Sequence, residues 1–129
     1  MGSWSAGVWG NDTAEDLKFE YQCAFYRYDP EEAVRRLDEY VRTSVGDESD
    51  TAEWCNYIYS LADFMWKKGI LTEAVKTAAV SMIDSGFGLE AWEEGGKSVL
   101  AKRRKALEKL RAQLLSPLPE RKPIRPKIP

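Results

Sequence analysis

Hydrophobic residues recur every three or four positions along most of the chain, which is the spacing of one face of an α-helix. Four segments show this pattern before residue 86. Their apolar positions are Leu17, Tyr21, Ala24, Phe25 and Tyr28; Ala33, Val34, Leu37, Tyr40 and Val41; Trp54, Ile58, Leu61 and Met65; Leu71, Val75, Ala78 and Met82. No segment alternates between polar and apolar residues as a half-buried strand does. The pattern therefore predicts an all-α fold.

Capping residues indicate where the first two helices begin and end. Asp12 or Thr13 can accept a backbone N–H in the first turn of a helix that ends near Tyr26. Asp29 is followed by a proline, and a capping side chain before proline is a typical helix start. This second helix is expected to run to about Ser44.

The third and fourth helices are expected to pack side by side. Asp50 or Thr51 can cap the third helix, which is apolar around most of its circumference and is therefore predicted to be central. Gly69 ends it, and Thr72 can begin the next helix only three residues later. So short a connection predicts an antiparallel helical hairpin, and the fourth helix ends at Gly86.

The last third of the chain changes in character. Residues 89–93 form a short turn or helix, and residues 97–115 form a long basic helix. Its narrow apolar stripe consists of Leu100, Leu107, Leu110 and Leu114. Residues 116–129 are rich in proline and basic residues, cannot continue a helix and have little to bury. We therefore expect one helical domain over residues 1–115, a compact bundle of about five helices, followed by a tail over 116–129.

Composition agrees with a single folded domain. The chain has 129 residues, of which 43% are hydrophobic and 31% charged, so it carries enough apolar material for one core. Its apolar runs are far shorter than the roughly 20 residues that cross a bilayer. The amino terminus lacks a basic and then apolar export signal. We expect a cytoplasmic protein that does not enter the membrane.

The chain contains no histidine, which removes the commonest general base and the commonest metal ligand. Cys23 and Cys55 stand 32 residues apart, a count and spacing that suit neither a disulfide scaffold nor a zinc site, so we expect both to be reduced and buried. Adjacent carboxylates such as Glu31 and Glu32 point about 100° apart on a helix and do not converge on a substrate. Residues 95–98 end like a phosphate loop but lack its strand and earlier glycine. These features predict a protein that is not an enzyme and has no cofactor or metal.

Charge is distributed unevenly. Residues 1–96 carry 19 acidic and 8 basic side chains, whereas residues 97–129 carry 2 acidic and 11 basic. A basic helix and tail could follow phosphates, with a footprint of Lys102, Arg103, Arg104, Lys105, Lys109 and Arg111. The simpler interpretation is that the basic helix neutralises the acidic body, because that body repels nucleic acid and no aromatic residue interrupts the basic segment. Nucleic acid is thus the less favoured partner.

The amino-terminal residues carry a resemblance to a known family. The pattern Trp4, Gly7, Trp9, Asn11, Asp12, Ala14 and Asp16 resembles the opening of a bacterial domain family of unknown function that begins W-G-x-G-x-[FW]-x-N-D-x-A-x-D. Ser5 stands where the family has glycine, and residues 66–71 and 114–117 are similar to members with an extended carboxy-terminal helical region.

The motif has a structural interpretation. Trp4 and Trp9 would act as apolar anchors beside glycine turns, and Asn11 and Asp12 would cap the first helix. We call this expected arrangement the aromatic clasp.

The resemblance implies a function, because related small proteins occur among immunity genes of bacterial polymorphic toxin systems. It implies a non-catalytic binding module that neutralises a cognate toxin domain, as a monomer or weak dimer. An acidic surface suits a basic partner such as the active face of a nuclease. Carboxylates beside exposed aromatic edges give the predicted interface: Tyr28, Asp29, Glu32, Asp47, Glu48 and Asp50. The alternative is a nucleic-acid-associated protein that uses the basic helix and tail.

Overall fold

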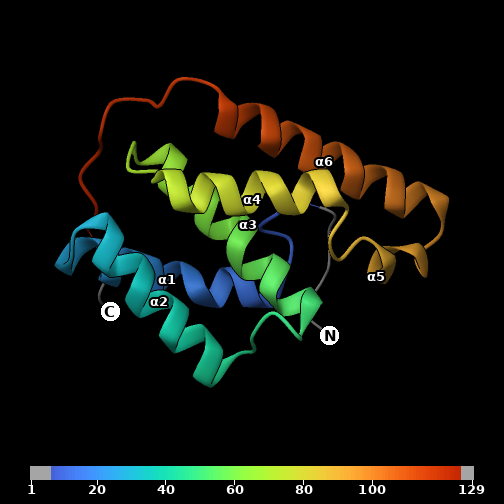
Figure 1. Cartoon of the computed structure of the whole chain (residues 1–129), viewed down its shortest axis with the longest axis horizontal. Helices are drawn as coiled ribbons and strands as arrows, with labels where there is room; N and C mark the ends of the chain where they lie inside the picture. The colour runs from blue at the N-terminus through green and yellow to red at the C-terminus, as the bar shows by residue number, and fades with distance from the viewer. Residues whose placement is uncertain (1–6, 126–129) are drawn as a thin grey trace.

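The computed structural model describes residues 7–125, in which six α-helices and no β-strand are found (Figure 1). The helices are α1 (Asp12–Arg27), α2 (Pro30–Ser44), α3 (Thr51–Lys67), α4 (Glu73–Ser85), α5 (Glu90–Glu93) and α6 (Lys97–Leu115). The predicted all-α fold is confirmed, with five long helices and the expected short turn of helix at α5. None of the described helices is both long and apolar enough to cross a membrane.

Helix α3 is the centre of the bundle, as its sequence predicts. All twelve residues from 54 to 65 are buried. Helix α1 packs on α3 and on α2, whereas α4 and α6 pack on α3 and on each other (Figure 1). Helices α3 and α4 form the predicted antiparallel hairpin, and the fully buried Ala79 of α4 allows their close approach.

The cap of α1 differs from the one expected from local spacing. Asn11, not Asp12 or Thr13, has the extended backbone of an N-cap, and its Oδ1 accepts the Ala14 N–H at 2.7 Å. Asp12 is already helical. The prediction from spacing is therefore wrong by one residue, whereas the motif placed Asn11 correctly. The other three helix starts are confirmed at Asp29, Asp50 and Thr72.

The described half of the aromatic clasp joins α1, α3 and α6. Trp9 packs edge-on against Tyr21, with ring centroids 6.2 Å apart, and its Nε1 donates to Asp63 Oδ2 at 2.7 Å. The other oxygen of this buried carboxylate accepts from Gln113 Nε2 at 2.7 Å. Asp63 thus holds the amino-terminal segment and two helices together. Trp4 lies outside the described residues.

The carboxy-terminal segment lies against the domain, but most of its described residues stay exposed, in keeping with the prediction that it has little to bury. Residues 116–125, which we call the strap, run from the end of α6 toward α1 and α2 (Figure 1). The Lys122 N–H donates to the Lys68 carbonyl at 3.0 Å, and Ile124 packs on the core. The strap passes so close to Gly69 that a Cβ there would lie 2.6 Å from the Pro119 carbonyl oxygen. The strap can pass this close because glycine at position 69 has no side chain.

Both cysteines are free thiols, but their environments differ. Cys55 is buried on α3 as expected. Cys23 is only half-buried, because it lies on the outer side of α1, where it lines a depression together with Ile124 of the strap.

Candidate functional site

The six predicted interface residues form two groups at opposite ends of α2. Tyr28, Asp29 and Glu32 lie at its start, and Asp47, Glu48 and Asp50 follow its end. Fifteen helical residues separate the ends by about 22 Å, at 1.5 Å per residue. The structure therefore does not bring the six residues together into one patch.

The first group is occupied by local interactions. The guanidinium of Arg36 lies 4.1 Å from the Tyr28 ring centroid, and Asp29 caps α2 by accepting the Glu32 N–H. Glu32 pairs with Arg35 at 2.5 Å and with Arg36 at 2.7 Å. Hydrogen bonds from these two arginines lower the pKa of the Glu32 carboxyl. This end of α2 thus has little uncompensated negative charge.

The second group is exposed to solvent. Asp47 accepts hydrogen bonds from the Ser49 N–H and hydroxyl, which lower the pKa of the Asp47 carboxyl. Glu48 pairs with Arg42, whose hydrogen bonds lower the pKa of the Glu48 carboxyl. Asp50 caps α3. The loop between α2 and α3 is therefore ordered by its own side chains and presents carboxylates to solvent.

A groove adjoins this loop where α1 begins, α2 ends and α3 begins. It has a volume of about 360 Å³. Its lining, which we call the acidic groove, consists of Thr13, Asp16, Leu17, Tyr40, Ser44, Val45 and Glu53. The Thr13 hydroxyl donates to Glu53 Oε2 at 2.6 Å, so a hydrogen bond between α1 and α3 fixes one wall. The groove is thus a built feature of three helices.

Tyr40 is the aromatic residue of the acidic groove, and the sequence pattern placed it wrongly. It was expected in the apolar stripe of α2, but its side chain is 42% exposed, whereas neighbouring Val41 is fully buried. Successive helical residues point about 100° apart, so only one of this pair can face the core. The exposed ring lies in the same groove as the carboxylates of Asp16 and Glu53. An aromatic face with two carboxylates suits a lysine or arginine side chain.

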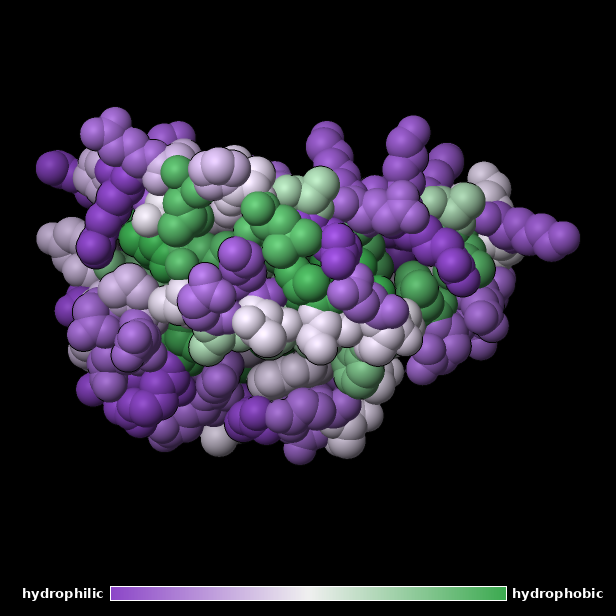
Figure 2. Space-filling view, turned by 45° about the horizontal axis from the view of Figure 1, so that its top comes forward, coloured by the Kyte–Doolittle hydropathy of each residue, from purple (hydrophilic) through white to green (hydrophobic). Residues whose placement is uncertain are grey.

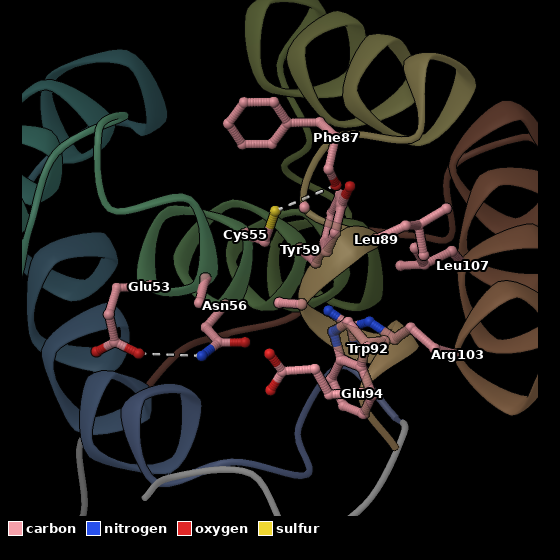
Figure 3. A pocket seen from close by; sticks show the side chains of 13 residues that line it. Glu53, Cys55, Asn56, Tyr59, Phe87, Leu89, Trp92, Glu94, Arg103 and Leu107 are labelled. Carbon is pink, nitrogen blue, oxygen red and sulfur yellow. Dashed lines mark hydrogen bonds between the residues drawn. The ribbon is translucent and has the colours of Figure 1, made fainter. Parts of the chain in front are cut away.

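A second pocket, of about 340 Å³, lies between α3, α5 and α6 (Figure 3). Arg103 is buried there, with its guanidinium 4.7 Å from the Trp92 ring centroid and 5.6 Å from that of Tyr59. Burial lowers the pKa of the Arg103 guanidinium and raises the pKa of the Cys55 thiol to about 11. Arg103 belonged to the predicted phosphate footprint. That assignment is wrong, because Trp92 and the helices enclose the side chain.

Most of the basic helix makes no direct ion pair with the body. Arg111 pairs with Asp84 of α4 at 2.6 Å. Five other basic residues of α6 are exposed: Lys97, Lys102, Arg104, Lys105 and Lys109. Within residues 7–125, no ion pair involves any of these five. Among the exposed or half-exposed basic residues of α6, direct pairing with the body is thus seen for Arg111 alone.

Comparisons of the chain with known protein families, curated proteins and solved structures gave no match. The described part of the chain also holds no group of three or more histidine, cysteine or acidic residues that could bind a metal ion. The candidate site is therefore defined by the geometry of the acidic groove and the neighbouring loop.

Proposed function

We propose that the protein is a non-catalytic binding module that captures a basic surface of a partner protein with its acidic groove. In this proposal it acts as an immunity protein that neutralises a cognate bacterial toxin. The observation that carries the proposal is Tyr40, a large aromatic side chain left 42% exposed between carboxylates in a groove of about 360 Å³. Partly exposed aromatic residues in a pocket are typical anchors of protein interfaces.

The charges around the groove support a basic partner. Hydrogen bonds from Ser49 lower the pKa of the Asp47 carboxyl, whose charge has no ion-pair partner within residues 7–125, whereas the charge of Glu48 is paired with Arg42. Asp16 lies in the groove itself. An acidic surface of this kind accelerates encounter with a basic partner and disfavours acidic competitors.

Only part of the predicted interface belongs to this proposal. Asp47, Glu48 and Asp50 do not line the acidic groove, but they lie on the loop between Val45 and Glu53, which do. Tyr28, Asp29 and Glu32 lie at the far end of α2 and are left out. Tyr40 and Asp16 of the acidic groove are included in the proposed interface instead.

The test uses the toxin domain encoded beside this gene, produced together with the full chain. We expect the chain to form a one-to-one complex and to protect cells from the toxin. Tyr40→Ala should weaken the complex at least tenfold, which corresponds to about 1.4 kcal/mol. The paired change Asp16→Lys and Asp47→Lys should slow association and reduce its dependence on salt.

Matched controls lie outside the groove. Tyr26→Ala removes another exposed tyrosine, on the outer side of α1, and should leave affinity within a few-fold. Glu90→Lys with Glu93→Lys reverses two charges on α5 and should leave the association rate within a few-fold. A chain that neither binds the neighbouring toxin nor protects against it would refute the function. Equal losses of affinity for the toxin domain in Tyr26→Ala and Tyr40→Ala would refute the acidic groove as the binding site.

A further inference from the structure

The outer side of α6 is a strongly basic surface that the proposed function does not use. Its members are Lys97, Lys102, Arg104, Lys105 and Lys109, which we call the basic face. All five are exposed, and none of them forms an ion pair within residues 7–125. The only acidic residue of α6 is Glu108. Figure 2 shows long hydrophilic side chains projecting from this side of the molecule.

Packing of α6 fixes which side chains point outward. The helix buries Arg103, Leu107, Leu110 and Leu114. At 100° per residue, Lys102, Lys105 and Lys109 lie on the opposite side, within about 60° of one another. These three form a line of about 10 Å at 1.5 Å per residue, whereas Lys97 and Arg104 lie about 80° to 100° further round the helix from Lys105.

The strap carries a separate set of basic residues beyond the helix. Arg121 and Lys122 are exposed, and the Lys122 backbone is bonded to Lys68 at the end of α3. The strap therefore places these residues beside α3 on its way toward α1 and α2 (Figure 1), so the basic face consists of α6 alone.

We propose that the basic face binds the phosphate backbone of double-stranded nucleic acid without reading its sequence. About 10 Å of duplex presents about three phosphates on one strand, which matches the three aligned lysines of α6. The basic face offers charge and small residues such as Ala101 and Ala112, with no aromatic side chain for stacking on unpaired bases.

Two other polyanionic partners fit the surface less well. A helix that binds a membrane surface inserts its apolar side into the lipid, but Leu107, Leu110 and Leu114 are buried in the protein core. An acidic protein interface would need a buried anchor at its centre, and the basic face presents none. Backbone phosphates need only positive charge in a row.

The experiment measures binding of the full chain to a fluorescein-labelled 24-base-pair DNA duplex by fluorescence anisotropy. With three to five phosphates neutralised, affinity should fall about 40- to 500-fold between 50 and 200 mM salt. The triple variant Lys102→Gln, Lys105→Gln, Lys109→Gln should bind at least tenfold more weakly at 50 mM salt. Its slope of log affinity against log salt should be shallower by about 2.7.

The control variant Lys18→Gln, Arg35→Gln, Arg36→Gln removes the same three charges from α1 and α2. It should bind duplex within about threefold of the unaltered chain, and circular dichroism checks that both variants keep their helices. Equal weakening by the two variants would show that net charge alone governs binding and would overturn the proposal. So would the absence of duplex binding at 50 mM salt, or binding to phosphatidylserine vesicles without binding to duplex.

Discussion

Replacing Gly69 by alanine tests whether the strap is an integral part of the folded domain. Gly69 and Gly86 both follow helices with positive φ, at 73° and 72°. Alanine in this left-handed conformation costs about 1 to 2 kcal/mol at either position. At Gly86 the added Cβ would have only Leu89 Cδ1 nearby, at 3.6 Å, which is an ordinary contact. Gly86→Ala therefore measures the backbone cost alone.

At Gly69 the same Cβ would lie 2.6 Å from the Pro119 carbonyl oxygen, a backbone atom that can move only with the strap. Displacing the strap gives up the Lys122 to Lys68 hydrogen bond, which contributes about 1 kcal/mol, and the partial burial of Ile124, which contributes about 1 kcal/mol. We therefore expect Gly69→Ala to lower the free energy of unfolding by about 3 to 4 kcal/mol.

The assay is urea unfolding followed by tryptophan fluorescence, with stability compared at constant m-value. Each glycine substitution is made in the full chain and in a chain that ends at Ser116. Without the strap, the cost of Gly69→Ala should fall to that of Gly86→Ala, about 1 to 2 kcal/mol. The contact between the strap and Gly69 would be refuted if Gly69→Ala and Gly86→Ala lowered the free energy of unfolding equally in the full chain. It would also be refuted if truncation left the effect of Gly69→Ala unchanged.

Two further predictions concern the cap of α1 and the buried thiol. Asn11→Ala should lower the free energy of unfolding by about 0.5 to 2 kcal/mol, because the Ala14 N–H loses its acceptor, whereas Asn11→Ser should cost less in the same urea assay. Burial raises the pKa of Cys55 to about 11, so its contribution to stability is complete below about pH 8.5 and decreases as pH rises toward 11. Between pH 8 and pH 10, the free energy of unfolding should therefore decrease less for Cys55→Ala than for the unaltered chain. The same decrease in both chains would contradict this prediction.

Most of the secondary structure follows from interactions between residues close in sequence. Asp29, Asp50 and Thr72 act as caps at their predicted positions because a cap needs only a side chain and a backbone N–H three residues later. The connection between Lys67 and Glu73 is short, which favours packing of α3 and α4 side by side. The apolar circumference of α3 likewise predicts its central position without knowledge of its neighbours.

The candidate site could not be predicted in the same way, because it depends on which helix faces meet. Tyr40 and Val41 both belong to the apolar stripe read from the sequence, and the packing of α2 on α1 leaves Tyr40 exposed. Asp16 and Glu53 are far apart in the chain, yet they share a groove because α1 and α3 are in contact. The two predicted acidic groups were assigned to one interface, but the length of α2 separates them.

Long-range packing also decides which charged residues are buried and where the carboxy-terminal segment lies. Arg103 belongs to a basic run, but its position on α6 turns it toward Trp92 and buries it, whereas Lys102 and Arg104 on either side remain exposed. The strap has the composition of a free tail. It is packed because Gly69 leaves room for a passing backbone, and that complementarity arises only when residues some 50 positions apart meet in the folded chain.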